Sequence, residues 1–313
     1  MYFRQFVKYI NHTLIIKIIK RKLSIFCNKK YDYFPTNQLI YFNSYTIHIT
    51  NRKLKYLSNL TYLNIYQDIY ITDKLLAYLP NLTQLYLHHN INLTNNHLKY
   101  LPKLTSLYLG YNNNITDEGF KHLTNLTHLI LKFNNKLTNN GLKYLPNLIY
   151  LDLCHNSNIT NEGLKHIPNL TYLDVAHNSN ITLKGLKYLP CLTHLYLWKY
   201  QHISNKNFKY LSNLTHLTLS GSKYITDKEL QYLPKLTYLH LFCNKIITNE
   251  GLKYLPNLTF LKLGYNTNIT YQGLKYLPHL EKLVLLYNTN IIDEDLKCLS
   301  KLKFYNYRKI DLN

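Results

Sequence analysis

Several residue types are scarce in this chain of 313 residues. It has one Met, one Trp, nine Gly and nine Pro, and only 16 acidic residues against 37 Lys and Arg. No window approaches 18 consecutive apolar residues, so the sequence supports no transmembrane helix. Its five cysteines show no CxxC or other metal-ligand spacing: Cys27, Cys154, Cys191, Cys243 and Cys298. We therefore expect a reducing, intracellular location.

Apolar residues, by contrast, make up 46% of the chain, which excludes a disordered or collagen-like protein. Tyr (32) and Asn (39) are unusually frequent, and both have A/T-rich codons, so part of this bias can come from the genome. The formal net charge of +21 is a reason to consider nucleic-acid or membrane binding until the charges are located.

The chain repeats itself every 22 residues. The leucine that opens each "LTxLxL" run recurs at Leu60, Leu82, Leu104, Leu126, Leu148, Leu170, Leu192, Leu214, Leu236, Leu258, Leu280 and Leu302. Counted from that leucine as position 1, the consensus is L-T-x-L-x-L-x-x-N-x-x-I-T-[DN]-x-G-L-K-Y-L-P-N. The solenoid is expected over 38–313, with a degenerate first repeat at 38–59, eleven full repeats over 60–301 and a partial repeat at 302–313.

Each part of the repeat predicts a local structure. Alternating leucines at positions 1, 4 and 6 indicate a short strand with one buried face. The Asn at position 9 can bond the backbone of the turns above and below it. Thr at position 13 is a suitable N-cap for a short helix with apolar contacts at positions 17 and 20, and the Pro at position 21 is expected to end that helix. No single unit can bury its own apolar face, so stacked repeats must form the core.

This pattern resembles the leucine-rich repeat over about 250 residues. Its "NxxIT[DN]xGLxxL" half is similar to the subtype found in F-box leucine-rich-repeat proteins. With the Asn, Tyr and Lys bias it also looks like the leucine-rich-repeat proteins of giant viruses that infect amoebae, while bacterial effectors with this repeat remain an alternative. The resemblance implies an α/β horseshoe with parallel strands on the concave face and short helices on the convex face, and a host cytoplasmic location if the source is viral.

The charges fall mainly at fixed repeat positions. Position 18 is Lys in nine of eleven repeats, and ten of the sixteen acids lie at positions 14 to 16, as the dipole of a short helix favours. The predicted concave positions 3, 5, 7 and 8 hold only four Lys and two Asp, so we expect a nearly neutral inner face.

That inner face is rich in aromatic and His residues, which favour protein interfaces. Trp198 is the residue most expected to be a binding hot spot. Codon bias alone is the alternative source of these tyrosines. The candidate partner-binding residues are Tyr86, Tyr108, Tyr150, Asp152, Tyr172, Asp174, His194, Tyr196, Trp198, His216, Tyr238, Phe242 and Phe260.

Chemistry of other kinds has little support in the sequence. Stacked repeats would bring together the pairs His155 and His177, His194 and His216, and Asp152 and Asp174, but repeat duplication explains this spacing without a metal. Cys154 and His155 are adjacent in sequence and would point to opposite faces of a strand, which argues against a nucleophile pair. No phosphate-binding glycine loop occurs. We expect no enzyme activity, cofactor or metal.

Residues 1–37 differ from the repeats. The first 30 contain eight Lys or Arg and no acid, with apolar residues at roughly helical spacing. A helical cap on the first repeat is the leading interpretation. An adaptor-binding segment, a membrane-surface helix and an organelle-targeting peptide remain alternatives, whereas the interrupting lysines argue against a secretory signal.

The leading hypothesis is a non-enzymatic scaffold that binds a protein partner on its concave face. The F-box resemblance implies one version, a substrate receptor of a ubiquitin ligase that contacts a Skp1-like adaptor, although residues 1–50 lack the usual Leu-Pro opening of an F-box. The alternative is binding of nucleic acid or another anionic surface through the basic convex face and the N-terminus.

Overall fold

The computed structural model describes residues 41–44, 58–66, 76–88, 93–112, 114–198, 205–221, 225–287 and 290–308. The basic segment 1–37 and most of the degenerate first repeat lie outside the described residues, so the interpretations placed on them stay predictions.

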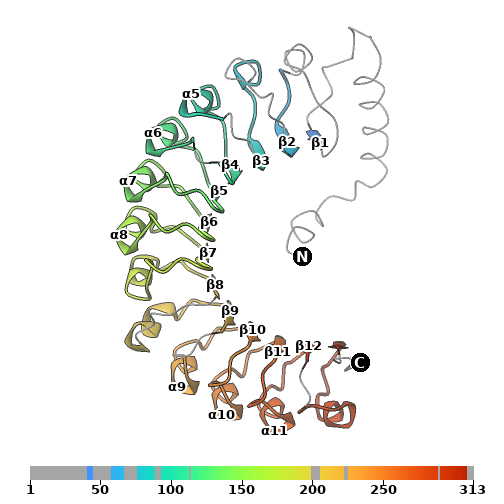
Figure 1. Cartoon of the computed structure of the whole chain (residues 1–313). Helices are drawn as coiled ribbons and strands as arrows, with labels where there is room; N and C mark the ends of the chain where they lie inside the picture. Colours follow the sequence, from blue (N-terminus) through green and yellow to red (C-terminus); the bar gives the residue numbers. More distant parts are fainter. Residues whose placement is uncertain are drawn as a thin grey trace, which may run out of the picture.

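The described strands form one parallel sheet of thirteen strands, in which each strand pairs with the next in sequence. The sheet lines the inner side of a curved solenoid and does not close, because β1 and β13 are not paired (Figure 1). The strands are β1 (Tyr41–Ser44), β2 (Tyr62–Tyr66), β3 (Gln84–His88), β4 (Ser106–Gly110), β5 (His128–Ile130), β6 (Tyr150–Asp152), β7 (Tyr172–Asp174), β8 (His194–Trp198), β9 (His216–Ser220), β10 (Tyr238–Phe242), β11 (Phe260–Gly264), β12 (Lys282–Leu286) and β13 (Phe304–Arg308). The predicted leucine-rich-repeat horseshoe is confirmed.

The strand register follows the 22-residue period. From β2 onward, each residue pairs with the residue 22 positions later, as Leu85 does with Leu107. The first pairing differs, since Tyr41 aligns with Tyr62 and the interval is 21 residues. Equal repeat positions therefore form continuous rows across the sheet from β2 to β13.

Short helices lie on the outer side of the arc (Figure 1). The described α-helices are α5 (Asn95–Leu98), α6 (Asp117–Phe120), α7 (Asn139–Leu142), α8 (Asn161–Leu164), α9 (Asp227–Leu230), α10 (Asn249–Leu252) and α11 (Tyr271–Leu274), and the 3₁₀ helices are η3 (Gly185–Tyr188), η4 (Asn205–Leu211) and η5 (Asp293–Cys298). Among the described residues, none of these helices has the length and apolar character needed to cross a membrane.

The α-helices begin as predicted but end earlier. In α7 the Thr138 side chain accepts a bond from the backbone N–H of Asn140, which confirms the N-cap at position 13. The helix ends at Leu142, with Lys143 as its C-cap, and the chain continues through i to i−3 backbone bonds such as Leu145 to Leu142. The prediction that the position-21 proline ends the helix was therefore wrong, because these tighter turns have already replaced the α-helical bonding.

Leucines from every repeat fill the space between sheet and helices. In one repeat, Leu148, Leu151, Leu153 and Leu164 are all fully buried. Burying such a side chain stabilises the fold by roughly 2 kcal/mol, and each one packs against the repeats on both sides, so the stability arises between neighbours.

The position-9 asparagines bond the turns as predicted. Buried Asn266 donates to the carbonyl of Asn244 in the preceding repeat, at 2.8 Å, and its Oδ1 accepts from the N–H groups of Asn268 and Ile269. One amide thus satisfies three backbone groups that a buried turn would leave unpaired.

The [DN] residue at position 14 links consecutive repeats, a role that the sequence analysis did not assign. Asp117 accepts bonds from the N–H (2.8 Å) and the hydroxyl (2.6 Å) of Thr138 in the next repeat. A Cβ at Gly141 would lie 2.5 Å from the same Asp117 carboxylate, which explains the glycine at position 16. Acids at this position therefore tie repeats together as well as complementing the helix dipole.

Candidate functional site

The concave face is built from repeat positions 3, 5 and 7. Side chains alternate across a strand, so Leu at positions 4 and 6 enters the core while positions 3, 5 and 7 face the inner side of the arc. On β10, Leu239 and Leu241 are fully buried, whereas Tyr238 and Phe242 are half-buried. Each of these positions forms a row of side chains across the strands, and the residue types in each row vary along the solenoid.

Position 3 forms a continuous row of aromatic and imidazole rings from β5 to β11. Successive ring centroids lie 3.9 to 6.0 Å apart, in the order His128, Tyr150, Tyr172, His194, His216, Tyr238 and Phe260. The shortest separation, 3.9 Å, joins Tyr150 and Tyr172. Six of the predicted site residues belong to this row. All seven rings are half-buried, because each covers part of the next.

Five further predicted residues occupy position 5. Tyr86 and Tyr108 stack at 6.2 Å on β3 and β4, and Tyr196 packs at 5.0 Å from Tyr172. The remaining two, Asp152 and Asp174, are direct neighbours on β6 and β7. Strand spacing of about 4.8 Å puts Tyr86 roughly 40 Å from Phe260, so the predicted residues form a long strip rather than one compact site.

The last two predicted residues meet at position 7. Trp198 on β8 and Phe242 on β10 approach to 5.9 Å between centroids, although β9 runs between them. The strand between them carries the small residue Ser220, which is 2% exposed. Trp198 itself is 37% exposed, so of the predicted site residues it presents the most open ring. Among the aromatic and His residues selected from the sequence, only Trp198 is exposed, and the other rings are half-buried by their stacking.

An acidic segment lies in the middle of the face, made of Lys132, Asp152, Cys154 and Asp174 on and directly after β5 to β7. Asp152 is 3% exposed and its carboxylate lies 3.1 Å from the ammonium of Lys132. Burial and the neighbouring Asp152 raise the pKa of Asp174 to about 7. Two adjacent carboxylates share one lysine, so Asp174, the one without the ion pair, is the group that holds a proton near neutral pH.

Burial, with the two carboxylates adding to it, raises the pKa of the Cys154 thiol to about 12. A nucleophilic cysteine needs the opposite shift, so the environment of Cys154 does not support a Cys–His pair. His155 has φ 59°, so the strand alternation that the sequence analysis assumed for these two residues does not extend to it.

A second polar group, which we call the donor segment, occupies position 5 on β9 to β11 and consists of Thr218, His240 and Lys262. Thr218 and His240 are 6% and 7% exposed, yet the Thr218 hydroxyl and both ring nitrogens of His240 have no hydrogen-bond partner. Burial lowers the pKa of His240 to about 4, with Lys262 adding to the effect, so the ring is neutral at pH 7. None of these three residues could be recognised from the sequence, because a single Thr, His or Lys in a variable position carries no signal until its neighbours are placed.

The turn after each strand adds another row of rings, at position 8. Tyr111, Phe133, His155 and His177 adopt left-handed backbone conformations with φ between 56° and 59°. Their rings stack at 4.2 to 4.4 Å along the edge of the sheet. Tyr111 and Phe133 were missed as candidates, although the run of aromatic and His residues at one repeat position was a usable signal.

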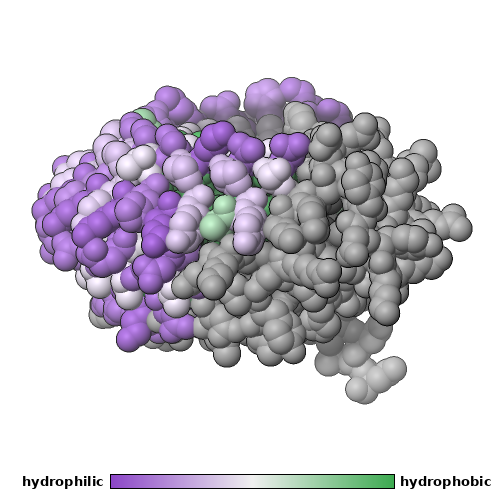
Figure 2. Space-filling model, turned by 90° about the horizontal axis from the view of Figure 1, so that it is seen from above, coloured by the Kyte–Doolittle hydropathy of each residue, from purple (hydrophilic) through white to green (hydrophobic). Residues whose placement is uncertain are grey.

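In the part of the chain that the structure describes, the position-18 lysines lie at the ends of the convex helices, as the sequence predicted. The lysine at position 18 pairs with a glutamate three residues earlier in three repeats and lies 5.0 to 5.7 Å from a tyrosine ring of the next repeat. These lysines are Lys121, Lys165 and Lys253. Seen from above, the described surface is mostly hydrophilic with scattered paler side chains (Figure 2).

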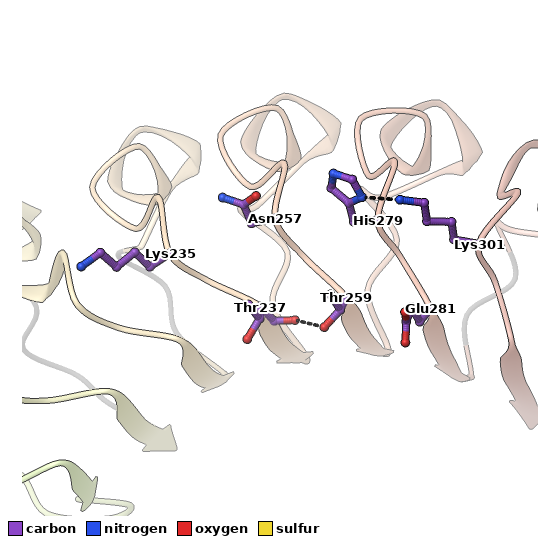
Figure 3. Close-up of a pocket in the computed structure, with 7 residues that line it drawn as sticks. All are labelled: Lys235, Thr237, Asn257, Thr259, His279, Glu281 and Lys301. Atoms are coloured by element: carbon purple, nitrogen blue, oxygen red, sulfur yellow. Dashed lines mark hydrogen bonds between the residues drawn. The ribbon is translucent and has the colours of Figure 1, made fainter.

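A shallow groove of about 430 Å³ follows the flank of the last repeats, where repeat positions 2 and 22 alternate. Figure 3 shows the Thr259 hydroxyl bonded to the carbonyl of Thr237, and His279 bonded to Lys301. Glu281 pairs with Lys303 at 2.9 Å. The groups lining this groove already serve contacts between repeats, so we assign it no ligand.

The histidine and aspartate pairs considered for a metal lie beside each other as the repeat spacing implied. The rings of His155 and His177 are 4.2 Å apart, and those of His194 and His216 are 4.0 Å apart. Across the described part of the chain, no three His, Cys, Asp or Glu side chains gather into a cluster that would hold a metal ion.

Comparison with known proteins agrees with this geometry. The description of the leucine-rich repeat family matches residues 100–121, 122–145, 144–167, 166–189, 232–255 and 254–277. The chain therefore carries leucine-rich repeats, as its resemblance implied, while the F-box subtype and a viral source stay predictions. None of the curated proteins matches the sequence.

Solved structures share the fold. An internalin (inlF) of Listeria monocytogenes is 24% identical, with a TM-score of 0.60 and 86% of each chain covered. TLR13, in its complex with ssRNA13, is 26% identical with a TM-score of 0.62, and the match covers 82% of this chain and 43% of TLR13. Rad7, from the Rad7 and Elc1 complex of yeast, is 18% identical with a TM-score of 0.52, covering 74% of this chain and 77% of the other.

Proposed function

We propose that this chain is a non-enzymatic scaffold that binds a protein partner along its concave face. The observation that carries the proposal is the unbroken row of stacked rings at position 3, which extends from β5 to β11. Stacking fixes these rings before a partner arrives, so little side-chain entropy is lost on binding. Large, rigid aromatic side chains are the residues that dominate protein interfaces.

The polar groups of the face fit the same proposal. A partner laid along the strip would meet the acidic segment, then Trp198, then the donor segment. Aromatic anchors flanked by a few fixed charges are typical of specific protein interfaces, in which the rings supply affinity and the charges select orientation.

Partner capture tests the proposal. We would crosslink the full chain in lysate of its native host and compare the wild type with a Trp198→Ala/Tyr172→Ala variant by mass spectrometry. The matched control is Tyr232→Ala/Tyr254→Ala, which removes two convex tyrosines that are 41% and 44% exposed. Loss of the same proteins from the concave variant alone supports concave binding. Equal capture by all three chains, with unchanged melting temperatures, would reject it.

A narrower version of the proposal is a substrate receptor of a ubiquitin ligase. Its support is the resemblance of the repeat to that of F-box proteins, and it requires residues 1–37 to contact a Skp1-like adaptor. A pull-down with purified Skp1 should retain the full chain and lose a chain that lacks residues 1–37. Failure to retain the full chain would remove this version and leave concave binding untouched.

The second candidate function is binding of single-stranded nucleic acid or another anionic surface. TLR13, 26% identical to this chain, was solved with ssRNA13, and several position-18 lysines, such as Lys187 and Lys209, have no carboxylate within ion-pair distance in the described residues. This function predicts an affinity that falls steeply between 50 and about 200 mM salt and does not change in Trp198→Ala. Concave protein binding predicts the reverse on both counts.

A further inference from the structure

The donor segment departs from the way this solenoid treats buried polar groups. Buried side chains with polar atoms are nearly always hydrogen-bonded in native proteins, and Asn266 at position 9 follows that rule through both atoms of its amide. Thr218 on β9 and His240 on β10 are neighbours in the strand register, and the side chain of neither makes a hydrogen bond. Among the described residues, His240 alone has two ring nitrogens that are both buried and unpaired.

Other unpaired buried atoms in the described chain are of a different kind. The unpaired amide nitrogens of Asn134 and Asn244 belong to side chains whose oxygen already accepts a hydrogen bond in a turn. Thr218 and His240 instead lie side by side at position 5, on the face that we propose binds the partner.

Lys262 gives the group its charge. It is the register neighbour of His240 on β11, about 5 Å away by strand spacing, and burial lowers the pKa of its ammonium. No carboxylate of the described residues lies within ion-pair distance of it. The two aspartates of the concave face are on β6 and β7, five and four strands from β11 respectively. A desolvated ammonium without a counter-charge favours an anionic ligand.

Rings surround these three polar groups and indicate what kind of molecule brings the anion. Tyr238 and Phe260 stack at 4.5 Å in the row at position 3, and the Phe242 ring lies 6.4 Å from that of His240 on the other side. Phe242 also leans over Gly264, where a Cβ would lie 2.5 Å from the ring. An anion between such apolar walls matches a carboxylate on a peptide chain whose neighbouring side chains contact the rings.

We propose that Thr218, His240 and Lys262 form a subsite for the carboxylate of an Asp or Glu side chain of the protein partner. The ammonium of Lys262, the hydroxyl of Thr218 and the single N–H of the neutral His240 ring donate to its two oxygens. The second nitrogen of His240 accepts from a backbone N–H of the partner. The subsite rests on the proposed function, because it presumes a protein bound on the concave face.

Selection of peptides tests the subsite. We would pan a display library of random linear 12-residue peptides against the full chain and measure the affinity of enriched peptides by fluorescence anisotropy. Each acidic residue of an enriched peptide is then replaced by its amide. The subsite variants are Lys262→Met and Thr218→Val, and the control is Lys282→Met, which removes an exposed lysine of β12 at position 3. Circular dichroism melts confirm that each variant is folded.

We expect enriched peptides to contain one Asp or Glu whose amide binds at least tenfold more weakly to the wild type. The same replacement should change binding to Lys262→Met by less than twofold, while Lys282→Met behaves as the wild type.

If the peptides lose affinity in Trp198→Ala but no acidic residue matters, the subsite is wrong and the proposed function stands. If no enriched peptide depends on Trp198 or Tyr172, both are wrong. If oligo(U) RNA binds and only Lys262→Met weakens it, the ligand is a phosphate backbone and the carboxylate proposal is overturned.

Discussion

The acidic segment and the donor segment occupy the same face, and their side chains at position 5 have the same register, yet their electrostatics are opposite. On β6 and β7, Asp152 and Asp174 share one lysine and one of them holds a proton near neutral pH. On β9 to β11, Thr218 and His240 are neutral and unpaired beside a lysine without a counter-ion. The repeat fixes where a side chain lies, while the residue at each variable position decides what that part of the face can bind.

Two cysteines make this difference measurable. Cys154 lies in the acidic segment with a thiol pKa of about 12, whereas Cys243 is exposed just after β10. Only the thiolate is alkylated, so iodoacetamide at pH 8 should modify Cys154 roughly 10³-fold more slowly than an ordinary exposed thiol. Peptide mapping by mass spectrometry over time gives the rate at each site.

Cys191, which is also exposed, is the internal control and should react at a rate similar to that of Cys243. Comparable rates at Cys154 and Cys243 would mean that burial and the two carboxylates do not suppress the thiolate, and the acidic segment as described would be wrong.

Asp174→Asn is the next largest expected effect. In the unfolded chain an aspartate loses its proton near pH 4, whereas folded Asp174 keeps it to about pH 7. The unfolded state thus binds fewer protons between these values, so the stability of the wild type falls as pH rises from 4 to 7. The variant keeps an Oδ1 acceptor for the N–H of Ala176 and lacks the titration, so it should be about 2 kcal/mol more stable at pH 7.5.

Urea unfolding at pH 4.5, 6.0 and 7.5 checks this prediction. The variant should show a smaller loss of free energy of unfolding over this range than the wild type. Parallel curves for the two proteins would show that Asp174 is ionised throughout and that the buried pair is not proton-linked.

Two threonines 3 residues apart sharpen the description of the donor segment. The hydroxyl of Thr215 donates to the carbonyl of Thr193 at 3.2 Å, whereas that of Thr218 has no partner. Valine replaces the hydroxyl by a methyl group of similar size. Thr215→Val should destabilise the chain by about 1 kcal/mol, because it removes a hydrogen bond, and Thr218→Val should stabilise it by about 1 kcal/mol, because it removes an unpaired buried group.

Chemical unfolding of both variants at pH 7.5 gives the two free energies. A loss of stability in Thr218→Val equal to that in Thr215→Val would mean that the Thr218 hydroxyl is bonded in solution, and the unpaired character of the donor segment would be lost.

The sequence predicted the repeating parts of this molecule well. Register, buried leucines, turn asparagines and Thr caps all follow from one 22-residue pattern, since each acts locally or on the identical neighbour. The helix ends were wrong because proline was read as a terminator, although 3₁₀ turns at Leu145 precede it. The link from Asp117 to Thr138 was missed because it joins different positions of two repeats, which a single-repeat consensus does not display.

The concave face was predictable as a strip but not in its chemistry. Tyr150 and Tyr172 were selected for being aromatic, and their stacking follows directly from the register. The donor segment depends on which of three unrelated residues become buried together, and on the absence of partners for them. Burial and pairing are properties of the packed face, so no count of residues at position 5 would have singled out Thr218 or His240.

The smallest predicted effect concerns the coupling within the donor segment. Burial is the main cause of the low pKa of His240, and the positive charge of Lys262 adds to it. Lys262→Met should therefore raise the pKa of His240 by less than about one pH unit, because the desolvation that dominates remains.

Histidine ring shifts in an NMR titration from pH 3.5 to 7.5 follow the protonation of His240 directly. His216 is the internal reference, since burial lowers its pKa to about 4 as well. Lys262→Met removes a charge two strands from His216, so the titration of His216 should stay in place. A rise of His240 to the ordinary histidine value would mean that Lys262, and not burial, keeps the ring neutral.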